Sequence, residues 1–160
     1  GGASLIKSAK IRSVCNDFLN YKNAYNAYYA QFGERAGTQS DGDISVDSIF
    51  PKLVEERIID SANWDGDACM TTSNKLKSGD AIFCFFEDEG NIFNKNDILL
   101  YLSPLTSEEG KSILKKLDNG EGNTGGMRAT YVNNSTETIS EDLSENTTDA
   151  KYNLYMKMDF

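Results

Sequence analysis

The cysteines are the residues of this sequence best suited to covalent chemistry, because histidine is absent. Without histidine there can be no Ser-His-Asp triad, no Cys-His nucleophile pair and no histidine-ligated zinc. Cys69 and Cys84 flank a polar turn, which favours a disulfide that closes this loop and contributes roughly 3 kcal/mol in the chain-entropy model. The alternative is that both are small buried apolar side chains in a reducing compartment. We expect Cys15 to be a packed free thiol, with pairing between chains as its alternative.

Clusters of acidic residues are the second set with chemical potential, because carboxylates and carbonyls can bind calcium. Calcium needs about six to eight oxygen ligands held together. The stretch "DGDISVD" lacks the glycine and the terminal glutamate of an EF-hand loop, so we expect solvated turns and no bound cofactor. The clusters are Asp41, Asp43 and Asp47; Asp65 and Asp67; and Asp118, Asn119, Glu121 and Asn123.

Composition predicts one globular domain with an acidic surface. The chain has 160 residues and a formal net charge of −9, with a sequence pI near 4.5. This charge argues against nucleic acid or an anionic membrane surface as the main partner, since both require a basic footprint. No run approaches the roughly 20 apolar residues of a membrane span, and no signal peptide is recognisable. We assign residues 1–4 to a cloning remnant and residues 5–160 to a single domain.

An aromatic stripe with helical spacing occupies the N-terminal part of the sequence. The apolar positions recur every three or four residues without a proline, which predicts one long helix over residues 5–33, with Gly33 as its C-cap. Tyrosine at most of these positions is poorly suited to a coiled-coil seam, so we expect the stripe to pack against a sheet. The segment before the stripe has no convincing cap, which suggests that the start of the helix is missing. The stripe consists of Ile11, Val14, Phe18, Tyr21, Tyr25, Tyr28 and Phe32.

The rest of the sequence predicts two short helices and an antiparallel meander. Residues 34–80 form a loop region with a short helix from about Asp47 to Ile58, capped by Asp47 or Ser48. Residues 81–160 hold the strands, at 81–88, 97–102, 127–133 and 152–160, and a further helix that begins with a capping box of Thr106 and Glu109. The polar tract 134–150 reads as a mobile surface loop. The predicted fold class is α+β, with a long N-terminal helix packed on an antiparallel sheet and short helices in the connecting loops.

Several segments, in this order, resemble type IV pilins and pseudopilins. The stretch "SAKIRSVCNDFLNYKNAYNAYYAQFG" is similar to the distal half of the pilin helix, which ends at "YG" or "FG". The segments "DSIFPKLVEERIID", "DILLYL" and "LTSEEGKSILKKLDNGEGNTGGMRA" resemble a subgroup described by a prepilin-type cleavage and methylation domain. The subgroup's turn, "IDxKxDDGxPxTGxxRA", is matched at Leu117, Asp118, Asn119, Gly120, Thr124, Gly125 and Arg128.

The sequence departs from the family pattern at two points. The usual "PGD" after the first helix is replaced by "GERAGTQSDGD". The cleavage glycine and the glutamate five residues into the mature protein are absent. The resemblance therefore depends on the globular part, from Ser8 to about Thr130.

The resemblance implies a pilin fold and a structural function. The chain would be a major or minor pilin of a type IV pilus or related filament, with other pilin subunits as partners. Its hydrophobic N-terminal half-helix, missing here, would hold it in the inner membrane, facing the periplasm, before it enters a filament on the cell surface. This oxidising route favours the disulfide between Cys69 and Cys84.

Exposed loops, including the tract 134–150, would then mediate adhesion to a receptor that the sequence does not identify. One alternative is a type II secretion pseudopilin with a calcium-stabilised loop, which would fit best with "LDNGEGN". The other is an adhesin or binding module outside any filament.

We expect no enzymatic activity and no nucleic-acid partner. The carboxylates of Glu108 and Glu109 are adjacent on a helix and so point to different sides, which is typical of solvated surface. Only Lys111, Lys115 and Lys116 approach the basic surface that DNA uptake would need.

Overall fold

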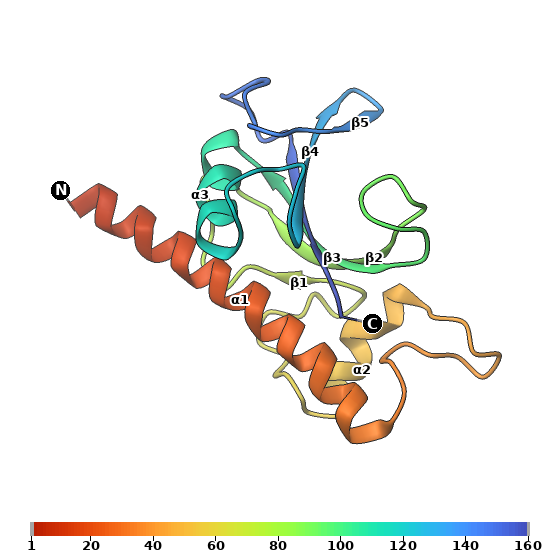
Figure 1. Cartoon of the computed structure of the whole chain (residues 1–160). Coiled ribbons are helices and arrows are strands. Elements are labelled where there is room, and N and C mark those ends of the chain that lie inside the picture. Colours follow the sequence, from red (N-terminus) through yellow and green to blue (C-terminus); the bar gives the residue numbers. More distant parts are fainter. Residues whose placement is uncertain (1, 160) are drawn as a thin grey trace.

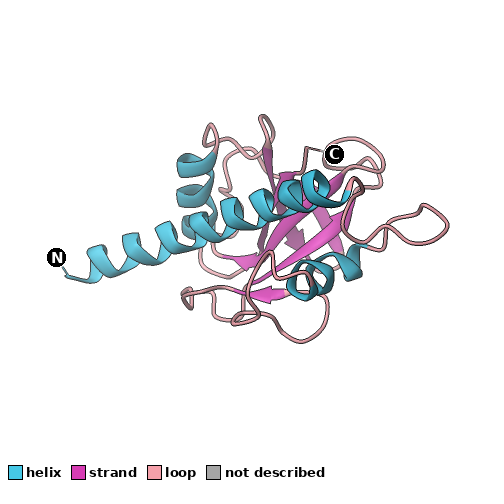
Figure 2. Ribbon diagram, turned by 90° about the horizontal axis from the view of Figure 1, so that it is seen from below, coloured by secondary structure: helices cyan, strands magenta, loops and turns pink. Residues whose placement is uncertain are grey.

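A long helix lies across one face of an antiparallel sheet (Figures 1 and 2). The structure is a computed structural model that describes the backbone of residues 2–159 and the side chains of residues 7–159. Helix α1 (Gly2–Phe32) is flanked by α3 (Ser107–Leu117) near its N-terminal half and by α2 (Ile49–Glu55) near its C-terminal half (Figure 1). The α+β prediction is confirmed.

The ends of α1 lie close to their predicted positions. The helix ends at Phe32 because Gly33 adopts a φ of +74°, a conformation that favours glycine, and its N–H donates to the carbonyl of Tyr29 at 2.8 Å. It begins at Gly2, earlier than predicted, so residues 2–4 form part of its first turns. Gly1, the first residue of the predicted cloning remnant, lies outside the described residues.

The six strands do not form the predicted meander. They are β1 (Met70–Thr71), β2 (Ile82–Glu87), β3 (Ile98–Leu105), β4 (Met127–Asn133), β5 (Thr136–Ile139) and β6 (Tyr152–Lys157), in the order β1-β2-β3-β6-β4-β5. The C-terminal strand β6 lies between β3 and β4 and is antiparallel to both. Since β3 and β4 are therefore parallel to each other, their connection must cross over, and it does so through α3. The local sequence of a strand does not specify its neighbours, which is why the meander prediction was wrong.

One row of cross-strand neighbours carries the core through the middle of the sheet. Phe83 pairs with Leu102, Leu102 with Leu154, and Leu154 with Ala129, and all four side chains are fully buried. Because side chains alternate along a strand, the adjacent positions face away from α1. The helix and this row form a single hydrophobic core.

The short helix α2 is shorter than predicted. A 3-10 turn at Val46–Ser48 precedes it, and Ser48 at its N-cap makes no capping hydrogen bond with its side chain. The helix ends at Glu55 because Arg57 adopts a φ of +59°, after which Ile58 donates its N–H back to the carbonyl of Leu53. The predicted end at Ile58 was therefore wrong, since the chain has already turned.

The polar tract 134–150 contains more structure than a mobile loop. Its first part is β5, which pairs with β4 in a hairpin whose turn places Asn134 at a φ of +57°. Further on, Leu143 is fully buried, and its carbonyl accepts a hydrogen bond from the hydroxyl of Ser107 in α3. The loop prediction was therefore wrong for residues 136–139, which form a strand, whereas residues 140–150 contain no helix or strand, as predicted. One buried leucine, and not a run of apolar residues, holds that second part to the core.

Candidate functional site

The aromatic stripe holds α1 to the sheet. Phe18 meets the ring of Phe83 edge-on at a centroid distance of 4.8 Å, and Tyr21 contacts the same ring at 5.2 Å. Tyr25 stacks on Phe85 at 5.6 Å. Such ring pairs add stability beyond the area they bury. The stripe residues that are at most 4% exposed are Ile11, Val14, Phe18, Tyr21, Tyr25 and Tyr28.

The prediction that Phe32 packs on the sheet was wrong. Its side chain is 41% exposed and its ring rests on Tyr28 of the preceding turn, 4.5 Å away. Phe32 follows Val14 by five full helical turns and so points in the same direction around the axis. Its exposure therefore comes from its position at the end of the helix, a feature that the spacing of the stripe does not reveal.

The predicted disulfide between Cys69 and Cys84 is present, with a Cα–Cα distance of 4.7 Å. It joins the segment just before β1 to the middle of β2 and so secures the short edge strand β1. Cys15 is a buried free thiol on α1, and its burial raises the pKa of the thiol to about 11. Because the thiolate is the reactive form and little of it is present at neutral pH, Cys15 is expected to be unreactive there.

Six of the seven residues that match the family turn lie together after α3, and the seventh, Leu117, is the last residue of that helix. The carboxylate of Asp118 accepts a hydrogen bond from the N–H of Met127 and lies against Gly125, where a Cβ would be only 2.4 Å from a carboxylate oxygen. Arg128 donates to the carbonyl of Gly125 at 2.6 Å, with its guanidinium 4.3 Å above the ring of Phe93. The remaining members, Asn119, Gly120 and Thr124, lie in the same turn, where Asn119 donates to the hydroxyl of Thr124 at 2.8 Å and Gly120 has a φ of +83°.

The acidic clusters proposed as calcium ligands are largely engaged with their own loops. Asp41 accepts from the N–H of Asp43, Asp65 from the N–H of Asp67, and Glu121 from the hydroxyl of Thr124. Across residues 2–159, no group of three or more histidine, cysteine, aspartate or glutamate residues is placed to hold a metal ion. Calcium binding at "LDNGEGN" stays a prediction.

Two buried carboxylates were missed by the sequence reasoning. Asp17 on α1 accepts hydrogen bonds from the N–H and the hydroxyl of Ser73, at 3.0 and 2.7 Å. Burial raises the pKa of Asp17, and the two hydrogen bonds from Ser73 partly oppose that rise. Asp88 is 1% exposed and accepts from the backbone N–H groups of Gly90 and Asn91, which organises the loop between β2 and β3. Both residues look like ordinary surface aspartates in the sequence, because their partners are set by the fold.

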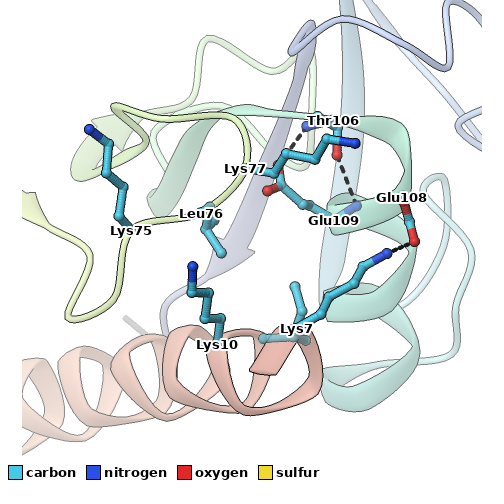
Figure 3. A pocket seen from close by; sticks show the side chains of 9 residues that line it. Lys7, Lys10, Lys75, Leu76, Lys77, Thr106, Glu108 and Glu109 are labelled. Atoms are coloured by element: carbon cyan, nitrogen blue, oxygen red, sulfur yellow. Dashed lines mark hydrogen bonds and ion pairs between the residues drawn. The ribbon is translucent and has the colours of Figure 1, made fainter. Parts of the chain in front are cut away.

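A basic pocket lies where α1, the loop after β1 and the start of α3 meet (Figure 3). It encloses a volume of about 500 Å³. Buried Ile11 and Leu76 form its apolar part. We call it the lysine pocket; its lining residues are Lys7, Lys10, Ile11, Lys75, Leu76, Lys77, Thr106, Glu108 and Glu109.

The acidic residues of the lysine pocket are already occupied. Glu108 forms an ion pair with Lys7. Glu109 accepts from the N–H of Thr106 at 2.9 Å, as the predicted capping box requires, and from the N–H of Ser78 at 3.1 Å. Among the described residues, Lys10, Lys75 and Lys77 have no ion-pair partner. The pocket therefore carries an excess of positive charge in a chain that is strongly acidic overall.

The helices of residues 2–159 contain no segment both long and apolar enough to cross a membrane.

Comparison with solved structures shows the type of fold. The chain is similar to the major type IV pilin PilA1 from Clostridium difficile, with a TM-score of 0.51 and 19% sequence identity over 96% of this chain and 97% of that chain. No protein-family model and no curated protein matches the sequence. A likeness at this identity establishes architecture and not activity. The long N-terminal helix packed on an antiparallel sheet is the type IV pilin fold.

Proposed function

We propose that this chain is a structural subunit of a type IV pilus or a related filament. The observation that carries the proposal is the likeness to a type IV pilin over nearly the full length of both chains. The placement of α1 supports it. From Ile11 to Tyr28 one face of the helix is buried against the sheet, whereas the first turns of the helix extend past the rest of the molecule (Figure 2). A projecting helix of this kind can pack against helices of other copies while the sheet remains outside.

In this proposal α1 continues upstream into a hydrophobic segment that anchors the chain in the inner membrane before assembly. Repeated contacts between different surfaces of identical subunits then generate an open helical filament. The disulfide between Cys69 and Cys84 suits the periplasm and the cell exterior, where disulfides persist. The chain would serve as a major or minor pilin with a structural and not a catalytic role.

Surface loops far from α1 are suited to adhesion. Strand β5 and the rest of the tract 134–150 lie on the side of the molecule away from α1 (Figure 1), and all four side chains of β5 are exposed. If α1 lies in the core of a filament, this region faces outward. We propose that it contacts the receptor.

The filament is tested directly in the native host. Antibodies against this chain are expected to label filaments along their length in immunogold electron microscopy, with a gene-deletion strain as the control. Mass spectrometry of sheared filaments is expected to find the chain with an apolar segment upstream of Leu5. Recovery of the chain only as a free secreted protein, with unlabelled filaments, would overturn the proposal.

Adhesion is tested with variants at exposed side chains that hold no part of the fold. Glu141→Lys together with Thr147→Lys is expected to reduce adhesion and leave the filaments intact. Lys95→Glu, in the exposed loop between β2 and β3, is the control. Unchanged adhesion in the first variant would remove the tract from the proposal.

A further inference from the structure

Charge is unevenly distributed along the axis of α1. Four lysines gather at the lysine pocket near the N-terminal half of the helix. Beyond the C-terminal end, residues 34–60 contain seven acidic and three basic residues, a net charge of −4. At about 1.5 Å per residue, Lys10 and Gly33 are about 35 Å apart along the helix. The molecule therefore has a basic region and an acidic region near opposite ends of α1.

The acidic region contains a projecting turn at residues 39–43, which we call the acidic tip. In Figures 1 and 2 the loop between α1 and α2 projects from the end of the molecule opposite to the N-terminus. The turn is ordered by its own hydrogen bonds, because Gln39 donates to the carbonyl of Asp43 at 2.8 Å and Asp43 donates to the carboxylate of Asp41 at 2.9 Å. Both aspartates are exposed and have no ion-pair partner within residues 2–159. The tip therefore presents, on a narrow, convex turn, two exposed carboxylates without an ion-pair partner in the described part of the chain.

The lysine pocket is the complementary surface in both shape and charge. It is concave, and its volume of about 500 Å³ falls in the range that accommodates a small ligand or a few side chains. Glu108 neutralises Lys7, which leaves Lys10, Lys75 and Lys77 as the cations without a partner in the described chain. Figure 3 shows Lys10 rising from α1 on one side, and Lys75 and Lys77 extending from the opposite loop. An anionic occupant of the pocket would gain favourable electrostatic energy from these unpaired lysines.

We propose that the lysine pocket of one copy of this chain receives the acidic tip of the next copy. This inference rests on the proposed filament function and names one of its contacts. Because the pocket and the tip are different surfaces near opposite ends of α1, the contact is heterologous, and in the proposed filament it would repeat from copy to copy. Charge pairs of this kind mainly set the choice of partner and the register of the contact.

The first experiment reverses the charges of the pocket in the native host. The variant K10E/K75E/K77E is expected to reduce the yield of sheared filaments about tenfold, which corresponds to about 1.4 kcal/mol of contact free energy. The control K95E/K111E/K115E makes the same change in net charge at exposed lysines outside the pocket and is expected to preserve the yield. Thermal melting of both purified variants checks that each is folded.

The second experiment restores the contact with opposite charges. D41K/D43K alone is expected to reduce filament yield as the pocket variant does, and its combination with K10E/K75E/K77E is expected to recover it. Asp43→Cys combined with Lys77→Cys is expected to give disulfide-linked ladders of subunits. Full yield in the pocket variant, or no recovery in the combined variant, overturns the inference.

Two outcomes separate this inference from the function on which it rests. If wild-type filaments are labelled by the antibody but the pocket variant assembles normally, only the inference fails. If no wild-type filament contains the chain, the proposed function fails.

An anionic lipid headgroup is the competing occupant of the lysine pocket, and sedimentation with phosphatidylglycerol vesicles tests it. Binding that K10E/K75E/K77E abolishes, together with normal filament yield in D41K/D43K, overturns the contact between copies.

Discussion

Two phenylalanines of α1 provide a matched test of how the helix is held to the sheet. Phe18 and Phe32 belong to the same stripe, yet Phe18 is fully buried whereas Phe32 is 41% exposed. Replacing each with alanine removes the same atoms from the same helix. The difference in the free energy of unfolding therefore measures the packing that the tertiary structure assigns to each position.

The expected magnitudes follow from burial. Phe18→Ala leaves a cavity beside Phe83, and truncation of a buried phenylalanine costs about 3–5 kcal/mol. Full burial of a phenylalanine stabilises by roughly 1.5–3 kcal/mol, so the partly exposed ring of Phe32 contributes about half of this. Alanine returns about 0.5 kcal/mol through its higher helix propensity. We expect Phe32→Ala to cost about 1 kcal/mol or less.

Urea unfolding followed by circular dichroism measures both losses. For a domain of this size, 1 kcal/mol shifts the melting temperature by about 2–4 °C, so Phe18→Ala should lower it by roughly 6–20 °C and Phe32→Ala by no more than about 4 °C. Phe18→Leu, with an expected loss of roughly 1–2 kcal/mol, serves if the alanine variant does not fold. Equal losses at the two positions would refute the packing described for α1.

Three further predictions concern positions that the fold constrains. Gly122→Ala should reduce the free energy of unfolding by about 2 kcal/mol or more, since its Cβ would lie 1.9 Å from the carbonyl oxygen of Ser140. The control Gly126→Ala, whose Cβ would meet no atom within 4 Å, should change it by less than about 0.5 kcal/mol in urea unfolding, and similar losses in the two variants would contradict the close approach at Gly122. Mass spectrometry after alkylation at pH 8 should find no addition to the native protein, one in denaturant at Cys15, and three after reduction; addition to the native protein would show that the thiol is accessible. Burial raises the pKa of Asp17 above its usual 3.8, so the folded state binds the proton of Asp17 more tightly than the unfolded state does. The contribution of Asp17 to stability therefore falls as pH rises from below 3.8 through the pKa of the folded state. Asp17→Asn should therefore gain stability relative to the wild type over that interval in unfolding measured from pH 3 to 7, and a difference that does not vary with pH would argue against a raised pKa.

Local signals account for the parts of the fold that the sequence predicts well. The spacing of the aromatic stripe identifies α1, and Gly33 marks its end because that backbone conformation favours glycine. Thr106 and Glu109 mark the start of α3, since a capping box needs only residues three apart. The disulfide between Cys69 and Cys84 belongs to the same class, because its members are close in sequence and flank a turn.

Long-range contacts decide the rest, because they join residues that no local pattern relates. The insertion of β6 between β3 and β4 depends on which backbone edges meet, and the exposure of Phe32 depends on its place at the end of α1. The lysine pocket brings Lys10 on α1 to within one cavity of Lys77, more than 60 residues further along the chain, although the sequence shows only scattered lysines in an acidic protein. Helix formation is a property of neighbouring residues, whereas the charge and shape of a surface arise only after distant segments have packed together.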